Sequence, residues 1–113
     1  LYSQDGLVSL IFNFQGALHA ACDKGQLSVI EFLLDNNADI NKQDSSNRMT
    51  PLHCAIFKKQ LSACELILKY EQVSNQNIES GITMSRIAQS SEIQALMENE
   101  LKSRRKVILV NSN

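Results

Sequence analysis

The stretch that decides the fold is TPLHCAIFKKQLSACELIL, which runs from Thr50 to Leu68. It begins with Thr50-Pro51, a pair suited to a helix start, because a threonine hydroxyl accepts hydrogen bonds from free backbone N–H groups and proline has no N–H to lose. Apolar residues then recur at helical spacing, at Leu52, Ala55 and Ile56. A second start follows at once, since Ser62 and Glu65 have the S-x-x-E spacing of a capping box. The stretch therefore predicts two short helices joined by a tight turn.

The same pattern occurs earlier in the chain, in GALHAACDKGQLSVIEFLL, residues 16–34. When the two stretches are aligned, the matched residues include Leu18 with Leu52, His19 with His53, Ala21 with Ala55, Ser28 with Ser62, and Glu31 with Glu65. Duplication at a period of about 20–50 residues is typical of a solenoid, in which stacked helical units bury one continuous core. The sequence therefore predicts repeated helical hairpins.

At this point the residues resemble a known family. The segment TPLHCA, residues 50–55, resembles the T-P-L-H-x-A pattern of the ankyrin repeat, whose period is about 33 residues. The segment Asn37-Ala38-Asp39-Ile40-Asn41 resembles the family's loop after the second helix, where Asn37 takes the usual place of glycine and suits a left-handed conformation. The resemblance covers about residues 15–101. It implies an all-α ankyrin-repeat solenoid of about two full repeats, whose work is to bind other proteins without chemistry of its own.

We expect a single ankyrin-repeat domain over residues 1–113, with degenerate helical caps at both ends. Residues 1–15 are interpreted as an N-terminal cap helix with an apolar stripe at Leu7, Leu10, Ile11 and Phe14. Two repeats follow over 16–49 and 50–82, then a degenerate capping repeat over 83–106 and a tail over 107–113. Continuing the repeat places Thr83 where Thr50 stands, and so places a hairpin connection over 76–82.

Three local features add to this interpretation. Lys59 stands where Gly25 stands in the first repeat, so a positive φ there would cost on the order of 1 kcal/mol. The last helix is expected from about Ser91, at an S-x-x-Q box, toward Arg105. The apolar tail VILVNSN either folds back along the stack or is a strand that pairs with a later part of a longer protein.

Composition bounds the class of protein. The chain has 113 residues and a formal net charge of −1, so it fits one small domain without the positive field that nucleic-acid binding needs. No basic leader or long apolar run suggests a signal peptide or a membrane span. The chain begins at Leu1, so we expect a fragment of a longer protein. Three cysteines without metal-knuckle spacing favour buried free thiols in an intracellular, cytoplasmic or nuclear setting.

Catalytic and metal sites have little support in the sequence. There is no glycine-rich phosphate loop, nucleophile elbow or H-E-x-x-H motif, so we expect no enzyme activity and no cofactor. A metal site of two histidines and two cysteines is conceivable, at His19, Cys22, His53 and Cys54, but the resemblance implies structural histidines instead. The basic run over 102–106 either touches phosphates or a nuclear-import receptor, or is a solvated helix end.

The resemblance implies that partners bind at the hairpin tips and at the concave face of each first helix. These positions fall on Asp23, Lys24, Phe57 and Lys58 in the helices, and on Arg48, Met49, Glu79, Ser80 and Ile82 in the tips. We expect Phe57, Met49 and Ile82 to form an apolar groove, because exposed apolar residues that gather together mark interaction sites. A basic edge of Lys24, Lys58 and Arg48 favours an acidic protein or peptide partner. The alternative is that Phe57 packs under a terminal cap.

A second interpretation of the function remains open. The domain would then be a regulatory or structural segment of a larger enzyme, channel or acyl-carrier binding protein, and its groove would pack against the rest of the same chain. Either way we expect a monomer or a part of a longer chain.

Overall fold

The computed structural model describes residues 16–111, with side chains described through Val107. Every regular element in this range is an α-helix. A first helix covers residues 16–24, and the helices after it are α2 (Leu27–Asp35), α3 (Pro51–Phe57), α4 (Leu61–Leu68), α5 (Asn75–Ile87) and α6 (Ser91–Asn111). The prediction of an all-α fold is confirmed for this part of the chain.

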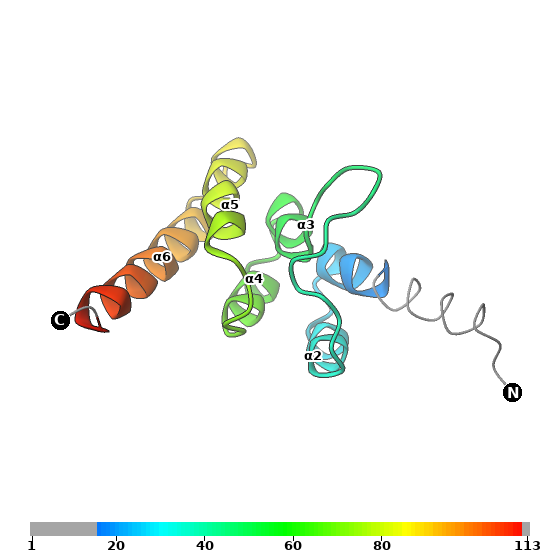
Figure 1. Ribbon diagram of the computed structural model, residues 1–113. Helices are drawn as coiled ribbons and strands as arrows, with labels where there is room; N and C mark the ends of the chain where they lie inside the picture. The colour runs from blue at the N-terminus through cyan, green and yellow to red at the C-terminus, as the bar shows by residue number, and fades with distance from the viewer. Residues whose placement is uncertain (1–15, 112–113) are drawn as a thin grey trace, which may run out of the picture.

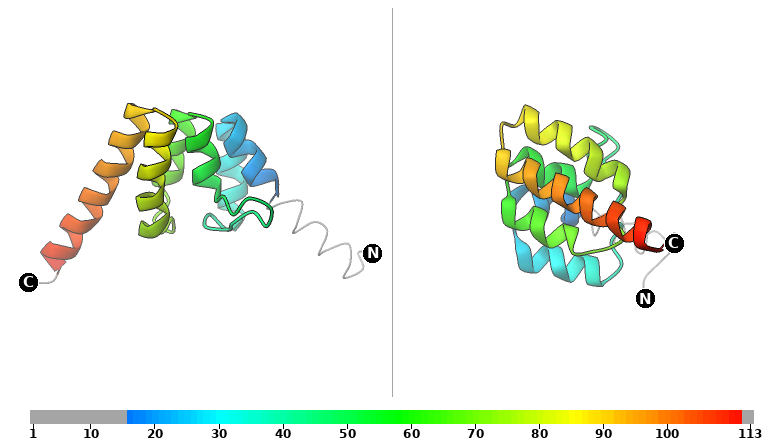
Figure 2. Two further views of the ribbon diagram at one scale, coloured as in Figure 1. Left: turned by 90° about the horizontal axis from the view of Figure 1, so that it is seen from above. Right: turned by 90° about the vertical axis from the view of Figure 1, so that its left-hand side faces the viewer.

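The helices stack as antiparallel pairs in two layers (Figure 1). The layer that we call inner holds the helix over 16–24, α3 and α5, and the outer layer holds α2, α4 and α6. Within each pair α3 contacts α4 and α5 contacts α6, and along the layers α3 contacts α5 while α4 contacts both α2 and α6. The C-terminal part of α6 splays away from the stack (Figure 2). This arrangement is a helical repeat solenoid.

The core lies between the layers and between successive pairs. Leu18 and its counterpart Leu52 are both fully buried, and so are Ile30, Ile56 and Ile67 on neighbouring helices. Complete burial of such a side chain contributes about 1.5–3 kcal/mol relative to its exposure. The third pair joins the same core through Ile78, Ile93 and Met97. The repeated apolar positions of the sequence are therefore the positions that hold the stack together.

The start of α3 is the one that the sequence predicts. The Thr50 hydroxyl accepts a hydrogen bond from the His53 backbone N–H at 3.2 Å, and the Thr50 N–H donates to His53 Nδ1 at 3.4 Å. Pro51 occupies the first helical turn, where its missing N–H would have no helical partner. Histidine thus completes a reciprocal capping box that more often uses glutamate or glutamine.

The predicted capping boxes at Ser28 and Ser62 are wrong. The helices α2 and α4 begin one residue earlier, at Leu27 and Leu61, and neither has a side-chain cap on the preceding glutamine. The physical reason is the tightness of the turn between the two helices of each pair. The second helix restarts so soon that the serine already lies inside its first turn.

Each tight turn depends on one residue in the left-handed conformation. Gly25 has φ +68°, Lys59 has φ +57° and Gln89 has φ +58°, and each lies two residues before the start of the next helix. The expectation of positive φ at Lys59 is therefore confirmed, as is a left-handed Asn37 with φ +71°. At these sites an L-residue with a side chain is strained by its Cβ atom. The turns thus mark equivalent positions in the three pairs.

Gly25 also makes room for a contact between repeats. The Gln60 side chain donates from Nε2 to the Asp23 carbonyl oxygen at 3.0 Å. A Cβ atom added to Gly25 would lie only 2.5 Å from Gln60 Oε1. The glycine therefore permits both the left-handed turn and the approach of the next repeat.

The third pair differs from the predicted one. A hairpin connection was expected over 76–82, but helix α5 runs without interruption from Asn75 to Ile87, and this expectation is wrong. The helix begins at Ser74, whose hydroxyl accepts from the Asn77 N–H at 3.1 Å. The connection from α4 to α5 has only residues 69–74, too few for a projecting hairpin. The loop is shorter and the inner helix after it is longer, since α5 has 13 residues whereas α3 has 7.

The chain ends also bear on the predictions. Helix α6 continues to Asn111, so the expectation that residues 107–111 fold back or form a strand is wrong. Glu92 near the start of α6 suits the partial positive charge at a helix N-terminus. The predicted cap helix over 1–15 and residues 112–113 lie outside the described residues.

Substituting Lys59 tests the strain assigned to the left-handed turn. Lys59→Gly is expected to raise the free energy of unfolding by about 1 kcal/mol, because glycine adopts positive φ without a Cβ clash. Urea unfolding followed by circular dichroism measures the change. Lys58→Gly is the matched control, since Lys58 has φ −90° and gains nothing from glycine. Equal stability of the two variants would contradict the assignment.

Candidate partner-binding surface

The long connection from α2 to α3, residues 36–50, carries a closed turn at its tip. The Asp44 N–H donates to the Met49 carbonyl at 2.8 Å, and the Arg48 N–H donates to the Asp44 carbonyl at 2.7 Å. The Asp44 carboxylate accepts from the Ser46 N–H at 2.7 Å, and hydrogen bonds from Ser46 hold the pKa of Asp44 below its usual range. Arg48 lies in this turn with φ +61° and is exposed. Its predicted place at a hairpin tip is confirmed.

The two histidines tie each inner helix to the segment after it. His19 Nε2 lies 3.0 Å from the carbonyl oxygens of both Lys42 and Met49, so it holds the base of the long connection. His53 accepts from the Thr50 N–H through Nδ1, which leaves the proton on Nε2. That Nε2 lies 2.8 Å from Ser80 Oγ and 3.2 Å from the Asn77 carbonyl oxygen. The expected structural role of both histidines is confirmed.

The left-handed turns define which inner-layer residues are equivalent. Two residues before Gly25, Lys59 and Gln89 stand Asp23, Phe57 and Ile87, which we call the inner row. Asp23 is half-buried, whereas Phe57 is 56% exposed and Ile87 is 76% exposed. Helices α3 and α5 lie side by side (Figures 1 and 2). Phe57 and Ile87 are the last residues of these two helices. They are the large apolar residues that the described inner layer leaves to solvent.

Basic side chains border the inner row. Lys24, Lys58 and Lys59 are exposed beside the turns, and the Lys58 Nζ atom lies 5.8 Å from the centroid of the Phe57 ring. Arg86 precedes Ile87 and forms an exposed ion pair with Glu98 at 3.7 Å. An exposed pair of this kind is worth little and is easily exchanged for another partner. The inner row thus has two exposed apolar members and a mainly positive margin.

The residues that were expected to form one groove differ in exposure and lie in different elements. Met49 lies two residues before α3 begins at Pro51 and Phe57 is the last residue of α3, so the six helical rises from Pro51 to Phe57 put about 9 Å along the axis between the two ends of the helix. Met49 and Ile82 are both half-buried against the core, and Ile82 lies within helix α5. Glu79 and Ser80 also lie in α5 rather than in a tip. The common groove of Phe57, Met49 and Ile82 stays a prediction, and the partial burial of Met49 and Ile82 leaves less of their side chains to form it.

Ile87 was missed because the repeat spacing was taken as constant. A constant spacing placed Ile87 at the position of Cys54, which is buried. The tight turns at Gly25, Lys59 and Gln89 are in fact unevenly spaced, because the step from the second turn to the third is the shorter one. The available signal was the start of the last helix at Ser91, because counting back from it to the turn puts Ile87 at the position equivalent to Phe57.

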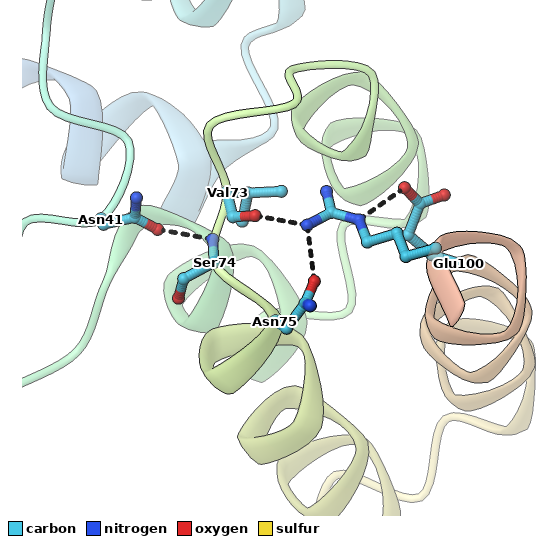
Figure 3. A network of polar contacts seen from close by, with 6 residues as sticks. Asn41, Val73, Ser74, Asn75 and Glu100 are labelled. Carbon is cyan, nitrogen blue, oxygen red and sulfur yellow. Dashed lines mark hydrogen bonds and ion pairs between the residues drawn. The ribbon is translucent and has the colours of Figure 1, made fainter. Parts of the chain in front are cut away.

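A polar network holds the short connection before α5 (Figure 3). Asn41 Oδ1 accepts from the Ser74 N–H at 3.0 Å, and Arg104 Nη1 donates to the Val73 carbonyl oxygen at 2.6 Å. Arg104 also bonds Asn75 Oδ1 at 2.9 Å and Glu100 Oε1 at 3.1 Å. The arginine therefore replaces, from the outer layer, the ties that a long connection would make. At least this member of the basic run is structural.

The three cysteines are free and buried. Burial raises the pKa of Cys54 to about 11 and that of Cys64 to about 12, and it raises the pKa of Cys22 as well. Thiols of this kind stay protonated at neutral pH and are poor nucleophiles. Among the side chains of residues 16–107, no three of His, Cys, Asp or Glu form a group able to hold a metal ion. None of the helices within 16–111 combines the length and apolar character needed to cross a membrane.

Comparison with known proteins gives one family and several relatives. The family model of ankyrin repeats (3 copies) matches residues 4–80. A protein of Rickettsia bellii (strain RML369-C) named as an ankyrin repeat protein is 38% identical over 72 residues, which cover 62% of this chain and 30% of the relative. An ADP-ribosylation factor GTPase-activating protein of Arabidopsis thaliana is 33% identical over 84 residues, covering 74% of this chain and 10% of its own length. The transient receptor potential channel pyrexia of Drosophila melanogaster is 36% identical over 62 residues, which cover 55% of this chain and 6% of the channel.

The pH dependence of stability tests the role of His53. Burial lowers the pKa of its imidazole, although the Asn77 carbonyl opposes this effect. In the unfolded chain the same group titrates near pH 6.5, so below that value the unfolded state binds more protons than the folded state. The free energy of unfolding is therefore expected to fall as the pH is lowered from about 7 to about 5.

His53→Gln keeps a side chain that forms hydrogen bonds but cannot titrate in this range. Its urea unfolding curves should lose part of the fall seen in the wild type between these pH values. Parallel pH profiles for the two proteins would show that His53 does not have to stay neutral in the fold.

Proposed function

We propose that this chain, which belongs to the ankyrin-repeat family, binds another protein. The proposed binding surface is the inner row together with the tip of the long connection. Ankyrin repeats are generally modules for protein–protein interaction and are typically not catalytic. The observation that carries the proposal is the exposure of Phe57 and Ile87 at equivalent positions of adjacent inner helices. Contiguous exposed apolar patches mark interaction sites, whereas single scattered apolar residues on a surface are ordinary.

The proposed site keeps most of the residues inferred from the sequence and adds one. Its apolar centre is Phe57 and Ile87, its margin is formed by Asp23, Lys24, Lys58 and Lys59, and Arg48 belongs to the tip of the long connection. Met49, Glu79 and Ile82 contribute less in this proposal, because Met49 and Ile82 are half-buried and Glu79 forms an ion pair with Arg105 at 3.3 Å. An aromatic side chain at the centre of a contact supplies a large share of binding energy.

The charge of the margin favours a particular kind of partner. Three exposed lysines beside the turns oppose one half-buried carboxylate, Asp23, so the local field is positive although the whole chain carries a formal charge of −1. Complementary charges raise association rates and exclude wrong partners. We infer that the partner presents apolar side chains flanked by Asp or Glu.

A second candidate function has one observation in its favour. The chain spans 30%, 10% and 6% of the three relatives described above, two of which are named as a GTPase-activating protein and an ion channel. If this chain is likewise a segment of a larger protein, the inner row would pack against another part of that protein. The same residues would then be buried by an intramolecular contact, and they would serve regulation or assembly.

Capture from extracts of the native cell tests the proposal. The bait proteins are the wild type, a Phe57→Ala, Ile87→Ala double variant, and Val107→Ala as a matched control that removes an exposed apolar side chain from α6. We expect a protein that the wild type and the control retain and the double variant loses. Identical captured proteins with all three baits, at equal folded content by circular dichroism, would remove the inner row from the proposal.

Affinity measurements on a captured partner then give the size of the effect. Phe57→Ala is expected to weaken binding by about 2 kcal/mol, which raises Kd about 30-fold. The stability of the fold should change little, because the side chain is more than half exposed. Raising the salt concentration should slow association if the lysine margin steers the partner.

A further inference from the structure

The C-terminal part of helix α6 carries a basic run that the proposed interaction surface does not use. The run, KSRRK, spans residues 102–106 and contains no acidic residue. Helix α6 begins beside the tight turn at Gln89 and runs away from it, and its C-terminal part splays away from the stack (Figure 2). This part of the helix is therefore separate from the inner row, which lies beside the turns.

Among the described side chains, two lysines of this run have no acidic partner. The glutamates of α5 and α6 that form ion pairs form them with arginines: Glu79 with Arg105, Glu98 with Arg86, and Glu100 with Arg104. Lys102 and Lys106 are exposed. Residues four apart lie on the same side of a helix, so the two lysines form one positive patch. Arg105 lies between them, and its exposed pair with Glu79 is easily exchanged for another partner.

Apolar residues follow the basic run directly. Val107 is 58% exposed, and the helix continues through the sequence Ile-Leu-Val to its end at Asn111. A hollow of about 470 Å³ lies between the end of α4 and this part of α6, and both Leu68 and Val107 line it. Glu71 and Glu100 also line the hollow, whereas neither lysine of the positive patch does. The end of α6 thus combines an exposed positive patch with an exposed apolar side chain.

We propose that the C-terminal part of α6 binds the surface of an anionic lipid bilayer. Basic and apolar residues that lie together on a helix are typical of segments held in the headgroup region. There the cations meet lipid phosphates and carboxylates, and apolar side chains reach the hydrocarbon boundary. Lys102, Arg105 and Lys106 supply the charge, and Val107 supplies the apolar contact. An acidic protein would satisfy the charge alone, whereas a bilayer surface also takes up the exposed apolar end of the helix.

The proposed binding is weak and reversible. A few basic residues and one short apolar segment fall short of the two strong signals that stable membrane anchoring needs. The attraction between the lysines and the lipid headgroups is electrostatic, so it weakens as the salt concentration rises. The proposal does not depend on the function assigned to the inner row, because the two surfaces use different residues.

Cosedimentation of the full chain with lipid vesicles tests the proposal. The vesicles contain phosphatidylcholine alone, or phosphatidylcholine with about 30% phosphatidylserine, which gives them a negative surface. We expect binding to the anionic vesicles only, and we expect it to weaken as the salt concentration is raised. Absence of binding to the anionic vesicles at low salt, or equal binding to both kinds of vesicle, would overturn the proposal.

Paired charge variants locate the contact. The Lys102→Gln, Lys106→Gln double variant is expected to bind anionic vesicles roughly 20-fold more weakly, because each lysine near a negative membrane surface contributes a factor of about five. The matched control is the Lys58→Gln, Lys59→Gln double variant, which removes the same charge beside a tight turn and should bind these vesicles like the wild type. All four lysines are exposed, so the folded content measured by circular dichroism should be equal. Equal losses in the two double variants would reject α6 as the site.

Val107 distinguishes a bilayer from an acidic protein as the partner. Val107→Ser is expected to weaken binding to anionic vesicles about threefold or more, because it removes an apolar side chain that the bilayer would bury. Unchanged vesicle binding by Val107→Ser would overturn the lipid assignment. Binding of the wild type to a polyglutamate peptide, without binding to anionic vesicles, would overturn it in favour of an acidic protein.

Discussion

One left-handed residue between two antiparallel helices sets the register of each helix pair within residues 16–111. Gly25, Lys59 and Gln89 hold these positions, and in each case the second helix begins two residues later. Because the turn is too short to allow a different register, it determines which residues of the preceding helix face the core and which face solvent. The candidate interaction surface follows directly, since Phe57 and Ile87 stand at the same distance before their turns.

Polar ties then join the units into one stack. His19 and His53 bond backbone oxygens of the segments after them, and Gln60 bonds the Asp23 carbonyl oxygen of the preceding turn. Where the third unit lacks a long connection, Arg104 takes over by bonding the Val73 carbonyl oxygen from α6. Buried polar groups are costly unless they are paired, so these bonds specify one arrangement of the apolar surfaces. The result is one stack in which Phe57 and Ile87 stay exposed.

The sequence predicted the first two units well and the third poorly. TPLHCA, the duplicated apolar positions and the exposure of Phe57 could all be inferred, because local capping and periodicity act within a few residues. The third unit could not be placed by a constant spacing, because the connection before it has only residues 69–74. The residues 76–82 that a constant spacing assigns to a hairpin belong to helix α5 instead. The missed site residue, Ile87, follows from that single error. Loop length changes the spacing of units without changing how each pair packs.

Backbone NMR of the chain tests this register most directly. The account predicts unbroken helical Cα secondary shifts from Asn75 to Ile87, followed by a left-handed signature at Gln89 in the shifts and in the coupling between the amide and Hα protons. Lys59 should show the same signature. Loop-like shifts over residues 76–82, with helical values at Gln89, would contradict the register and with it the pairing of Phe57 with Ile87.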